Sequence, residues 1–529
     1  MNKSYRPAYH ASVPSGWAND PNGTIWYGGQ AHLFYQHYPH RPSWGTMHWG
    51  HMSTRDFLHW QQHPVALIPD RDYELLCGCC SGSALELDGQ MTLMYTAAQP
   101  WLQRQCLARS EDGGEHFIKD PENPILAAAD LDPEISPLDF RDPRLFRRGD
   151  WYYLLAGVRI ITPAQREKLE KWTKVLEEAN QGATLSSEIQ SPSDTLRSPS
   201  AGSTDEADLE LLGRGNLALA RSRDLRHWEY VGHLLHPQPE LPELNGAFFA
   251  LNGAYECPDY LTVDGRELLL SSPQNLHRQG DRYQNLHSGT WMLGKLDFDT
   301  GAFHVDSMGE LDKGFDFYAA QTLRTPDGRA VLIAWKEMWD RSFPTRDEGW
   351  AGTYSLPREL RVEGNRLYQA PVREIETIRG AGTRQDAFPV AEGETGFQGI
   401  RGGCCELSVS LLPGSAQRAG LKLFQGAEHE TLLYYDRAKG CLVLDRSRSG
   451  LPITGREADV NRRFCPVANP EAISLRIFLD RSCLEVFVEE GREVLTANVY
   501  PDPEDEGISF FAQGGSAQFR DLVHYELNP

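Results

Sequence analysis

The sequence predicts an all-β protein in which a β-propeller is followed by a C-terminal β-sandwich. Three observations support this fold class: short β-type runs between turn signals, a polar fragment that recurs along the chain, and an alternation of apolar and polar residues near the C-terminus. The chain has 529 residues, of which 40% are hydrophobic and 24% charged. This length implies two or more domains, and this composition is typical of folded protein.

In the N-terminal part, short runs of β-forming residues alternate with turn-forming residues, as in a β protein. Runs rich in aromatic and β-branched residues occur at Thr24–Tyr27, His32–Tyr35 and Met91–Tyr95. Turn-forming residues, such as Gly28 and Gly29, separate consecutive runs. This pattern favours short antiparallel strands over helices.

A fragment with a polar turn and an aromatic residue recurs in this part of the chain. Ser53–Trp60 resembles Arg221–Trp228, and Ser110–Phe117 is a looser copy. Similar sheets arranged around an axis produce such repeats, so we predict propeller blades.

The segment 162–213 interrupts the β pattern and is predicted to be an insertion in a blade. Its first part, Pro163–Glu178, has a proline near the start and apolar residues at helical spacing. Its second part, 186–208, is rich in Ser, Thr, Pro, Asp and Glu, a composition that favours a mobile segment.

The C-terminal part is predicted to be a separate β-sandwich. Leu475, Ile477 and Leu479 alternate with polar residues, as expected for strands with one buried face. We expect the propeller to span residues 1–356, a charged linker 357–388, and the sandwich 389–529.

Charge and composition exclude several classes of partner. With 52 basic and 74 acidic residues the net charge is −22, which disfavours nucleic acid and anionic membranes. No run is long and apolar enough to span a membrane, and the N-terminus lacks the apolar core of a signal peptide, so we expect a cytoplasmic protein.

The ten cysteines are expected to be reduced thiols, and no metal is expected. Cys77–Cys80 and His48–His51 could each suggest a metal site. The cysteine stretch has no second ligand pair at zinc-site spacing and is better interpreted as thiols in a strand. The histidine stretch is equally ambiguous, and metal binding is disfavoured there too.

Three acidic residues stand beside turn-forming or aromatic residues instead of on charged surfaces: Asp20, Asp142 and Glu256. Each alone is compatible with a plain turn. Strands from different propeller blades converge on one channel, however, so these carboxylates can meet. Aromatic neighbours would raise a carboxyl pKa, whereas Arg141 would hold Asp142 ionised. One protonated and one ionised carboxyl group are what the hydrolysis of a glycosidic bond requires.

These motifs resemble glycoside hydrolase family 32, the group of invertases, sucrose-6-phosphate hydrolases and fructan hydrolases. The opening motif of the family reads WANDPNG at Trp17–Gly23, and its other signatures stand at Arg141–Pro143 and Glu256–Pro258. Matches in the same order extend over nearly the whole chain, except the 162–213 insertion.

The resemblance implies a five-bladed propeller, a supporting sandwich and a retaining reaction at the anomeric carbon of a β-linked fructofuranosyl unit. Asp20 would be the nucleophile, Glu256 the general acid/base, and Asp142 a stabiliser that binds sugar hydroxyls. Asp20 and Glu256 should then lie about 5–5.5 Å apart. The polar neighbours of Asp20 should favour its ionised form, and the setting of Glu256 suits an acid.

The resemblance also implies which residues line the fructose subsite, with core packing as the alternative for the two tryptophans. They are Asn19, Gln36, Trp44, Ser81, Arg141, Tyr318 and Trp335. Two departures from the family pattern are Ala18, where a larger apolar residue is common, and Cys80, where phenylalanine often stands. They leave the packing beneath Asp20 and the width of the pocket open.

The leading hypothesis is a β-fructofuranosidase acting on sucrose, sucrose 6-phosphate or short fructo-oligosaccharides without a cofactor, and the sequence leaves open whether it is a homo-oligomer. A fructosyltransferase would use the same covalent intermediate. A non-catalytic sugar-binding propeller would be expected to have lost a carboxylate, and the two signature motifs disfavour a glycosidase for arabinose-type sugars.

Overall fold

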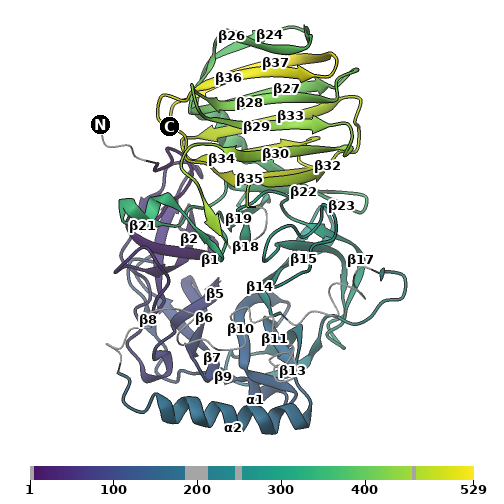
Figure 1. Cartoon of the computed structure of the whole chain (residues 1–529). Coiled ribbons are helices and arrows are strands. Elements are labelled where there is room, and N and C mark those ends of the chain that lie inside the picture. Colours follow the sequence, from purple (N-terminus) through teal and green to yellow (C-terminus); the bar gives the residue numbers. More distant parts are fainter. Residues whose placement is uncertain (1–4, 185–212, 243, 245–252, 456–459) are drawn as a thin grey trace.

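The computed structural model describes residues 5–184, 213–242, 244, 253–455 and 460–529. A ring of β-sheets forms one end of the molecule, and a two-sheet sandwich, drawn in green and yellow, is stacked on it (Figure 1). In the described part of the chain, no helix is long and apolar enough to cross a membrane.

Five antiparallel sheets form the ring, and their strands follow one another along the chain. The first blade contains β1 (Gly16–Tyr27), β2 (Gln30–Tyr38), β3 (His48–Thr54) and β4 (Gln61–Gln62). The second contains β5 (Gly78–Leu87), β6 (Gln90–Gln99), β7 (Leu102–Ser110), β8 (Ile118–Lys119) and the short β9 (Leu126–Ala127). The third contains β10 (Ile135–Arg148), β11 (Trp151–Ile160), β12 (Arg214–Ser222) and β13 (Trp228–His233). The fourth contains β14 (Tyr255–Val263), β15 (Arg266–Pro273), β16 (Thr290–Leu296) and β17 (Phe303–Glu310). The fifth contains β18 (Tyr318–Arg324), β19 (Ala330–Trp335), β22 (Arg358–Glu363) and β23 (Arg366–Pro371).

The first strand of each blade faces the ring axis, and these strands contact one another in cyclic order. β1, β5, β10, β14 and β18 each contact the next, and β18 returns to β1. The short β21 (Trp350–Ala351) also pairs in parallel with β1. The ring is therefore closed, and the predicted all-β propeller followed by a sandwich is confirmed.

The recurring sequence fragment forms the same turn in three blades, between the third and the outermost strand. In the first blade Asp56 Oδ2 lies 2.7 Å from His59 Nδ1. Asp112 with His116 and Asp224 with His227 make the equivalent contacts, at 2.7 and 2.8 Å. The repeat thus reflects a structural turn that an aspartate side chain stabilises.

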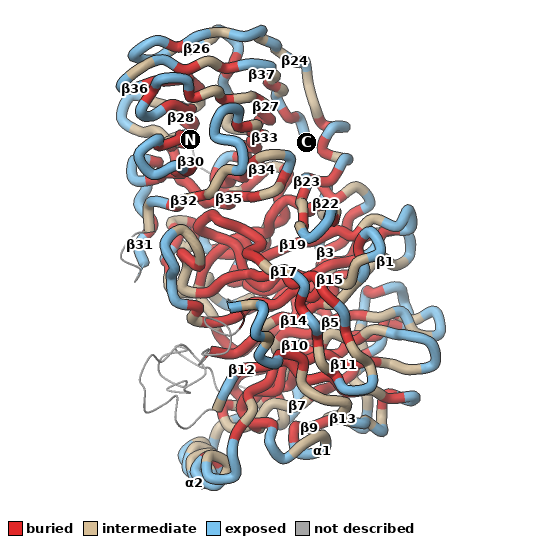
Figure 2. Tube along the Cα trace, turned by 90° about the vertical axis from the view of Figure 1, so that its right-hand side faces the viewer, coloured by how far each residue is buried: buried red, intermediate tan, exposed pale blue. Residues whose placement is uncertain are grey.

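The predicted helix in the insertion is confirmed as α2 (Pro163–Ala179). The Thr162 side chain accepts a hydrogen bond from the Gln165 backbone, and Pro163 occupies the first turn, so the helix begins at a regular N-cap. Leu169 is its one buried residue, and most of the helix is exposed (Figure 2). The predicted mobile segment 186–208 lies outside the described residues. The other short helices are α1 (Ala128–Leu131), η1 (Asp72–Glu74), η4 (Pro344–Glu348) and η5 (Arg373–Ile378).

Two sheets form the sandwich and enclose an aliphatic and aromatic core. One sheet contains β24 (Arg379–Gln385), β25 (Phe388–Val390), β27 (Cys404–Leu412), β33 (Ile473–Asp480), β34 (Cys483–Val488), β35 (Glu493–Asn498) and β37 (Ala517–Leu527). The other contains β26 (Gly393–Arg401), β28 (Arg418–Gln425), β29 (Glu430–Asp436), β30 (Cys441–Arg448), β32 (Arg462–Pro466) and β36 (Gly507–Gln513). A small pair, β20 (Arg341–Ser342) with β31 (Thr454–Gly455), links the two units.

The fifth blade extends beyond its expected end. The expected limit at residue 356 precedes β22 and β23, both of which belong to this blade, so the expected linker 357–388 contains two propeller strands. Only η5 separates β23 from β24 of the sandwich. The charges that suggested a linker are partly buried: Arg358 is fully buried against Glu485 of the sandwich, with 2.7 Å between Nη2 and Oε2.

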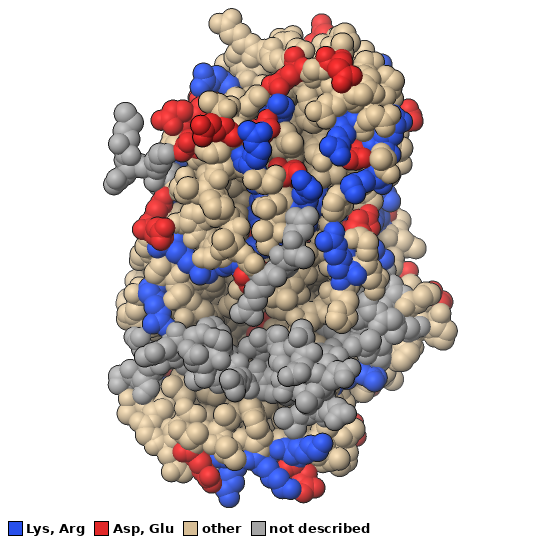
Figure 3. Space-filling model, viewed as in Figure 1, with Lys and Arg blue, Asp and Glu red and all other residues tan. Residues whose placement is uncertain are grey.

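Charged side chains of both signs are interspersed on the face shown in Figure 3, with no continuous basic stripe over the described residues. Acidic and basic groups also pair at the junction of the two units. His10 Nδ1 lies 2.8 Å from Asp480, and Arg358 Nη2 lies 3.1 Å from Asp312. The propeller and sandwich therefore share a buried polar interface.

Candidate active site

The innermost strands carry a local irregularity at the same level of the ring. In each blade the register between the first and second strands shifts at a corresponding place, and the first and third blades have one further shift each. The corresponding shifts lie between Ala18 and Pro21, Cys80 and Gly82, Arg141 and Arg144, Glu256 and Asp259, and Tyr318 and Gln321. A bulge re-aims a side chain out of the regular pleat. The bulges therefore bring one predicted site residue from each blade to one region, namely Asp20, Ser81, Asp142, Glu256 and Tyr318.

Asp20 lies in the bulge of the first blade and is held from the second. The Ser81 hydroxyl donates to Asp20 Oδ2 at 2.8 Å, and the Gln36 amide donates to the Ser81 hydroxyl at 2.6 Å. The other oxygen, Oδ1, makes no hydrogen bond to any residue that the structure describes. Nearby, Trp17 Nε1 donates to the Asn19 side chain at 2.8 Å. One oxygen of Asp20 is thus fixed while the other has no protein partner.

Glu256 lies in the bulge of the fourth blade and is bound from both neighbouring blades. Arg141 donates to Glu256 Oε1 through Nη2 at 3.0 Å and Nε at 3.2 Å. The Tyr318 hydroxyl donates to Glu256 Oε2 at 2.6 Å. Both oxygens of this carboxyl group therefore have a partner, and the group remains partly exposed, with 16% of its side-chain surface accessible.

Cys257 connects the three acids. Its backbone N–H donates to Asp142 Oδ2 at 3.0 Å, and its Sγ lies 3.6 Å from Asp20 Oδ2. Both Asp142 and Cys257 have positive φ, at 59° and 46°, which is uncommon for residues other than glycine. This strain is located where the carboxylates meet, as is typical of functional sites.

Burial raises the pKa of two of the three carboxyl groups. Desolvation, followed by the negative charge of Glu256, raises the pKa of Asp20 to about 6, although the hydrogen bond from Ser81 acts in the opposite direction. The hydrogen bonds from Ser81 and from Asn19, one of the polar neighbours, do favour the ionised form of Asp20 as expected, but burial outweighs them and the net shift of the pKa is upward. A pKa near 6 still leaves Asp20 mainly ionised at pH 7.

The expected partnership of Arg141 with Asp142 is also corrected. Burial raises the pKa of Asp142 to about 7, even though the Arg141 guanidinium opposes this shift. Arg141 Nε lies 4.0 Å from Asp142 Oδ2, beyond hydrogen-bond distance, because the guanidinium is turned towards Glu256 and Asp139. Arg141 therefore hydrogen-bonds to Glu256 and not to Asp142, its neighbour in the sequence.

The aromatic residues of the predicted subsite form an apolar cluster behind the carboxylates. Trp335 is fully buried, and its ring packs edge-on against Trp17 at 5.7 Å between centroids. Tyr318 belongs to the same cluster, whereas Trp44 is half-buried at its border. Core packing, the alternative considered for the tryptophans, thus describes Trp335 in this structure, and Trp44 is the more accessible of the two.

Several residues at the site were not expected. Thr96 of the second blade accepts a hydrogen bond from the Asp142 backbone N–H at 3.0 Å, and Asp139 contacts Arg141. The sequence around these residues carries no motif, and their proximity depends on the blade arrangement. Cys257 was visible as part of a motif, but its contact with Asp20 was not.

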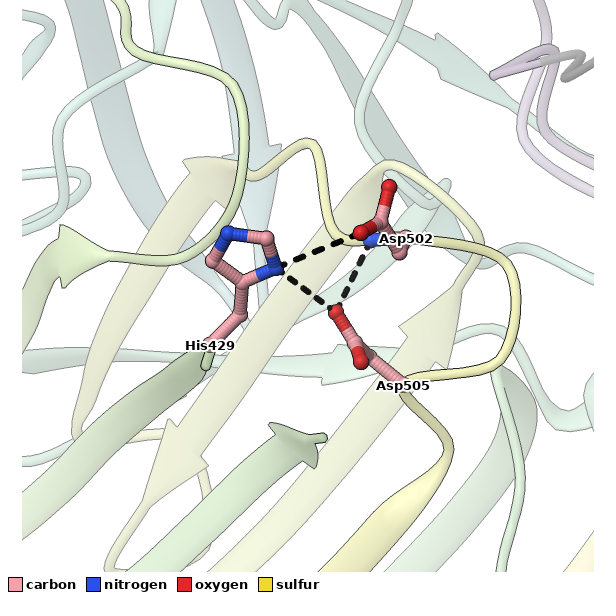
Figure 4. Close-up of side chains that lie close together, drawn as sticks. All are labelled: His429, Asp502 and Asp505. Carbon is pink, nitrogen blue, oxygen red and sulfur yellow. Dashed lines mark hydrogen bonds and ion pairs between the residues drawn. The ribbon is translucent and has the colours of Figure 1, made fainter. Parts of the chain in front are cut away.

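The thiol and histidine stretches considered for metal binding do not form such a group in the described residues. The one set of three suitable side chains there is His429, Asp502 and Asp505, on the sandwich (Figure 4). His429 Nδ1 lies 3.0 Å from Asp505 Oδ2, which also accepts the Asp502 backbone N–H at 3.0 Å. These groups satisfy one another and lie outside the propeller.

A closed propeller with three carboxylates gathered at its inner strands is the architecture of a glycosidase, which uses paired acids on the two sides of a glycosidic bond. Comparison with known proteins gives the same class. The N-terminal domain profile of glycosyl hydrolases family 32 matches residues 10–190 and 202–371, and the C-terminal profile matches residues 374–526. The chain therefore belongs to glycosyl hydrolase family 32.

Individual relatives cover nearly the full length. A sucrose-6-phosphate hydrolase of Zymomonas mobilis is 34% identical and is aligned over all of this chain and 93% of its own length. A raffinose invertase of Escherichia coli is 32% identical over 98% of this chain and 94% of the relative. Among solved structures, a family 32 β-fructofuranosidase of Bombyx mori superposes with a TM-score of 0.74 at 29% identity, covering 100% of this chain and 95% of the other. A sucrose-6-phosphate hydrolase of Lactobacillus gasseri gives 0.77 at 26% identity, covering 99% and 93%.

Proposed function

We propose that this protein is a β-fructofuranosidase that hydrolyses terminal β-linked fructofuranosyl units. The observation that carries this proposal is the meeting of Asp20, Asp142 and Glu256 around Cys257 in a family 32 propeller. In the proposed retaining reaction, Asp20 attacks the anomeric C2 and displaces the leaving sugar, and water then releases fructose from the covalent intermediate.

The contacts of each acid fit its proposed role. Asp20 Oδ1 has no protein partner and is the attacking oxygen, while Ser81 holds Oδ2. Glu256 gives a proton to the glycosidic oxygen as the bond breaks and later takes one from water. Asp142 accepts hydrogen bonds from sugar hydroxyls and opposes the positive charge that develops at C2. A separation of about 5–5.5 Å between Asp20 and Glu256 remains a prediction of the retaining mechanism.

The remaining predicted residues bind the fructose unit in this proposal. Asn19, Gln36, Ser81 and Arg141 supply polar contacts, Tyr318 holds Glu256, and Trp44 supplies an apolar wall, while Trp335 belongs to the buried cluster against which Trp44 packs. Sucrose, sucrose 6-phosphate and short fructo-oligosaccharides are the proposed substrates. The names of the relatives support this range, and a Bombyx mori relative was solved in complex with sucrose.

A side-by-side assay of sucrose, sucrose 6-phosphate, kestose and inulin, with products resolved, tests the proposal. We expect free fructose as a product, and transfer products in its place would favour the fructosyltransferase. Asp20→Ala and Glu256→Gln should each lose several orders of magnitude in turnover without unfolding the protein. Near-normal turnover in either variant would refute the roles assigned.

A cytoplasmic location is part of the proposal, because all ten cysteines are free, as expected in a reducing compartment. Cell fractionation tests the location. Light scattering on the purified protein tests whether it forms a homo-oligomer.

A further inference from the structure

A buried line of alternating charges lies behind Glu256. Arg141 Nη1 donates to Asp139 Oδ1, and Asp139 Oδ2 lies 3.2 Å from Arg159 Nε. With the contact from Arg141 to Glu256, the order is Arg159, Asp139, Arg141, Glu256. We call these four residues the ion chain. Asp139 is fully buried, and Arg159 is 1% exposed.

Local strand geometry creates this line. Asp139 and Arg141 stand two positions apart on β10, and the register of β10 with β11 pairs Phe140 with Val158, which places Arg159 beside Asp139. Glu256 comes from β14 of the next blade. Gly157 lies opposite Arg141, and a Cβ there would come within 2.2 Å of the Tyr255 carbonyl oxygen, so glycine lets the two blades approach.

Asp139 divides its charge between two guanidinium groups. Among the described residues it is the one carboxylate within 4.0 Å of Arg159, and it also binds Arg141. Buried charges are stable only when they are paired. The ion pair with Arg159 weakens the attraction between Asp139 and Arg141, and this in turn affects how strongly Arg141 interacts with Glu256.

We propose that Asp139 and Arg159 are positioning residues that set how strongly Arg141 holds Glu256, and thereby how readily Glu256 gives its proton to the leaving sugar. This inference rests on the proposed function. Neither residue is hydrogen-bonded to Glu256. The groups that face Glu256 are Arg141 from β10, Tyr318 from β18, the Cys257 thiol of its own strand, and the charges of Asp20 and Asp142, while Arg159 acts on it only through space.

Two substitutions should move the upper limb of the pH profile of kcat/KM in opposite directions. In Asp139→Asn, Arg141 loses a counter-charge and holds the Glu256 carboxylate more tightly, so the limb moves to lower pH by about 0.5–1 unit. In Arg159→Met, Asp139 forms an ion pair with Arg141 alone. Arg141 then binds the Glu256 carboxylate less tightly, so the upper limb moves to higher pH by a similar amount. A mere packing defect would lower the melting temperature in both variants without this opposition of sign.

The double variant Asp139→Asn/Arg159→Met removes both charges of this ion pair together. The upper limb of its pH profile should therefore lie near that of the wild type. It also keeps the inference testable where a single variant is too unstable. Arg159→Lys should restore the wild-type limb. Arg144→Met is the matched control, because Arg144 Nε pairs with buried Asp259 at 2.8 Å between the same two strands, yet neither residue belongs to the ion chain. It should lower stability and leave the limb in place.

The assay compares sucrose with p-nitrophenyl β-fructofuranoside, whose leaving group needs little protonation. The shifts in limb should be accompanied by a larger change in kcat for sucrose than for the aryl substrate. Active variants whose limbs stay unmoved, or move in the same direction, would overturn the inference alone. A wild-type protein that releases no fructose would instead refute the proposed function.

Discussion

The Cys257 thiol lies 3.6 Å from Asp20 Oδ2, while the backbone N–H of the same residue donates to Asp142 at 3.0 Å. A single residue of the fourth blade thus contacts acids of the first and third blades. Because Glu256 is its immediate neighbour in the chain, the positions of all three acids are coupled through one dipeptide. The bulge that gives Cys257 its positive φ is therefore part of the site's geometry.

Cys257→Ala should lower kcat/KM for sucrose by about tenfold and move the lower limb of its pH profile to higher pH. The thiol is one of two side-chain donors at Asp20 Oδ2, and its loss removes a group that opposes the burial-induced rise in the Asp20 pKa. Steady-state kinetics from pH 4 to 9 measure both effects. Cys257→Ser keeps a donor and should retain more activity than the alanine variant, and equal activity of the two would contradict this account.

The wild-type lower limb should fall near pH 6, because Asp20 must be ionised to attack and its pKa is raised to about 6. Ser81→Ala removes the 2.8 Å hydrogen bond to Asp20 and should move this limb upward. Gln36→Leu, which leaves the Ser81 contact with Asp20 in place, should shift it less. An unmoved limb in Ser81→Ala would show that Asp20 is not the group that titrates there.

Sequence motifs were sufficient to predict the propeller and to single out the three acids that the structure brings together, because turn residues and acids that bulge from inner strands are local features. The partner of Arg141 was not predictable in this way. The sequence suggested Asp142, its neighbour, whereas the guanidinium extends to Glu256, 115 residues away. The blade arrangement decides that pairing, and no local pattern reports it.

The end of the fifth blade could not be predicted from the sequence for a similar reason. The charged stretch that begins at Arg358 has the composition of a linker, yet it forms β22 and β23. Arg358 tolerates full burial because Glu485 and Asp312 balance its charge across the domain junction. Charge alone therefore could not separate an exposed linker from a strand that is buried against another domain.

Asp142→Asn should abolish most activity but stabilise the protein at pH 8, by an amount on the order of 2 kcal/mol. Its pKa is raised from an ordinary value near 3.8 to about 7 by burial, so the folded state binds a proton that the unfolded state releases. Wild-type stability should therefore fall as pH rises from about 4 to about 7, where this carboxyl group ionises in the folded state.

Urea denaturation at pH 5 and pH 8 measures the effect of Asp142→Asn. The advantage of the variant over the wild type should be larger at pH 8 than at pH 5. The opposite order would mean that the Asp142 carboxylate stabilises the fold.

Exhaustive chelation should leave sucrose hydrolysis unchanged, since carboxylates supply the charge that the proposed reaction requires. His429→Ala, which opens the histidine–aspartate group of the sandwich, should likewise leave kcat/KM unchanged. Activity after EDTA treatment and after restoring zinc, calcium or magnesium provides the test. Activity that is lost with EDTA and recovered with one ion would require a metal in the mechanism.

Arg358→Met should destabilise the protein by about 3 kcal/mol, because it leaves Glu485 and Asp312 buried without their shared cation. These groups lie on both sides of the junction, so the propeller and the sandwich should unfold in one transition in the wild type. In the variant, the unfolding transition should move to lower urea concentration. Tryptophan fluorescence and circular dichroism measure this transition. Arg373→Met is the matched control, because Arg373 pairs with Glu359 near the surface and its side chain is 63% exposed. Its loss should cost less than about 1 kcal/mol, and an equal loss in both variants would argue against a stabilising role for the buried junction.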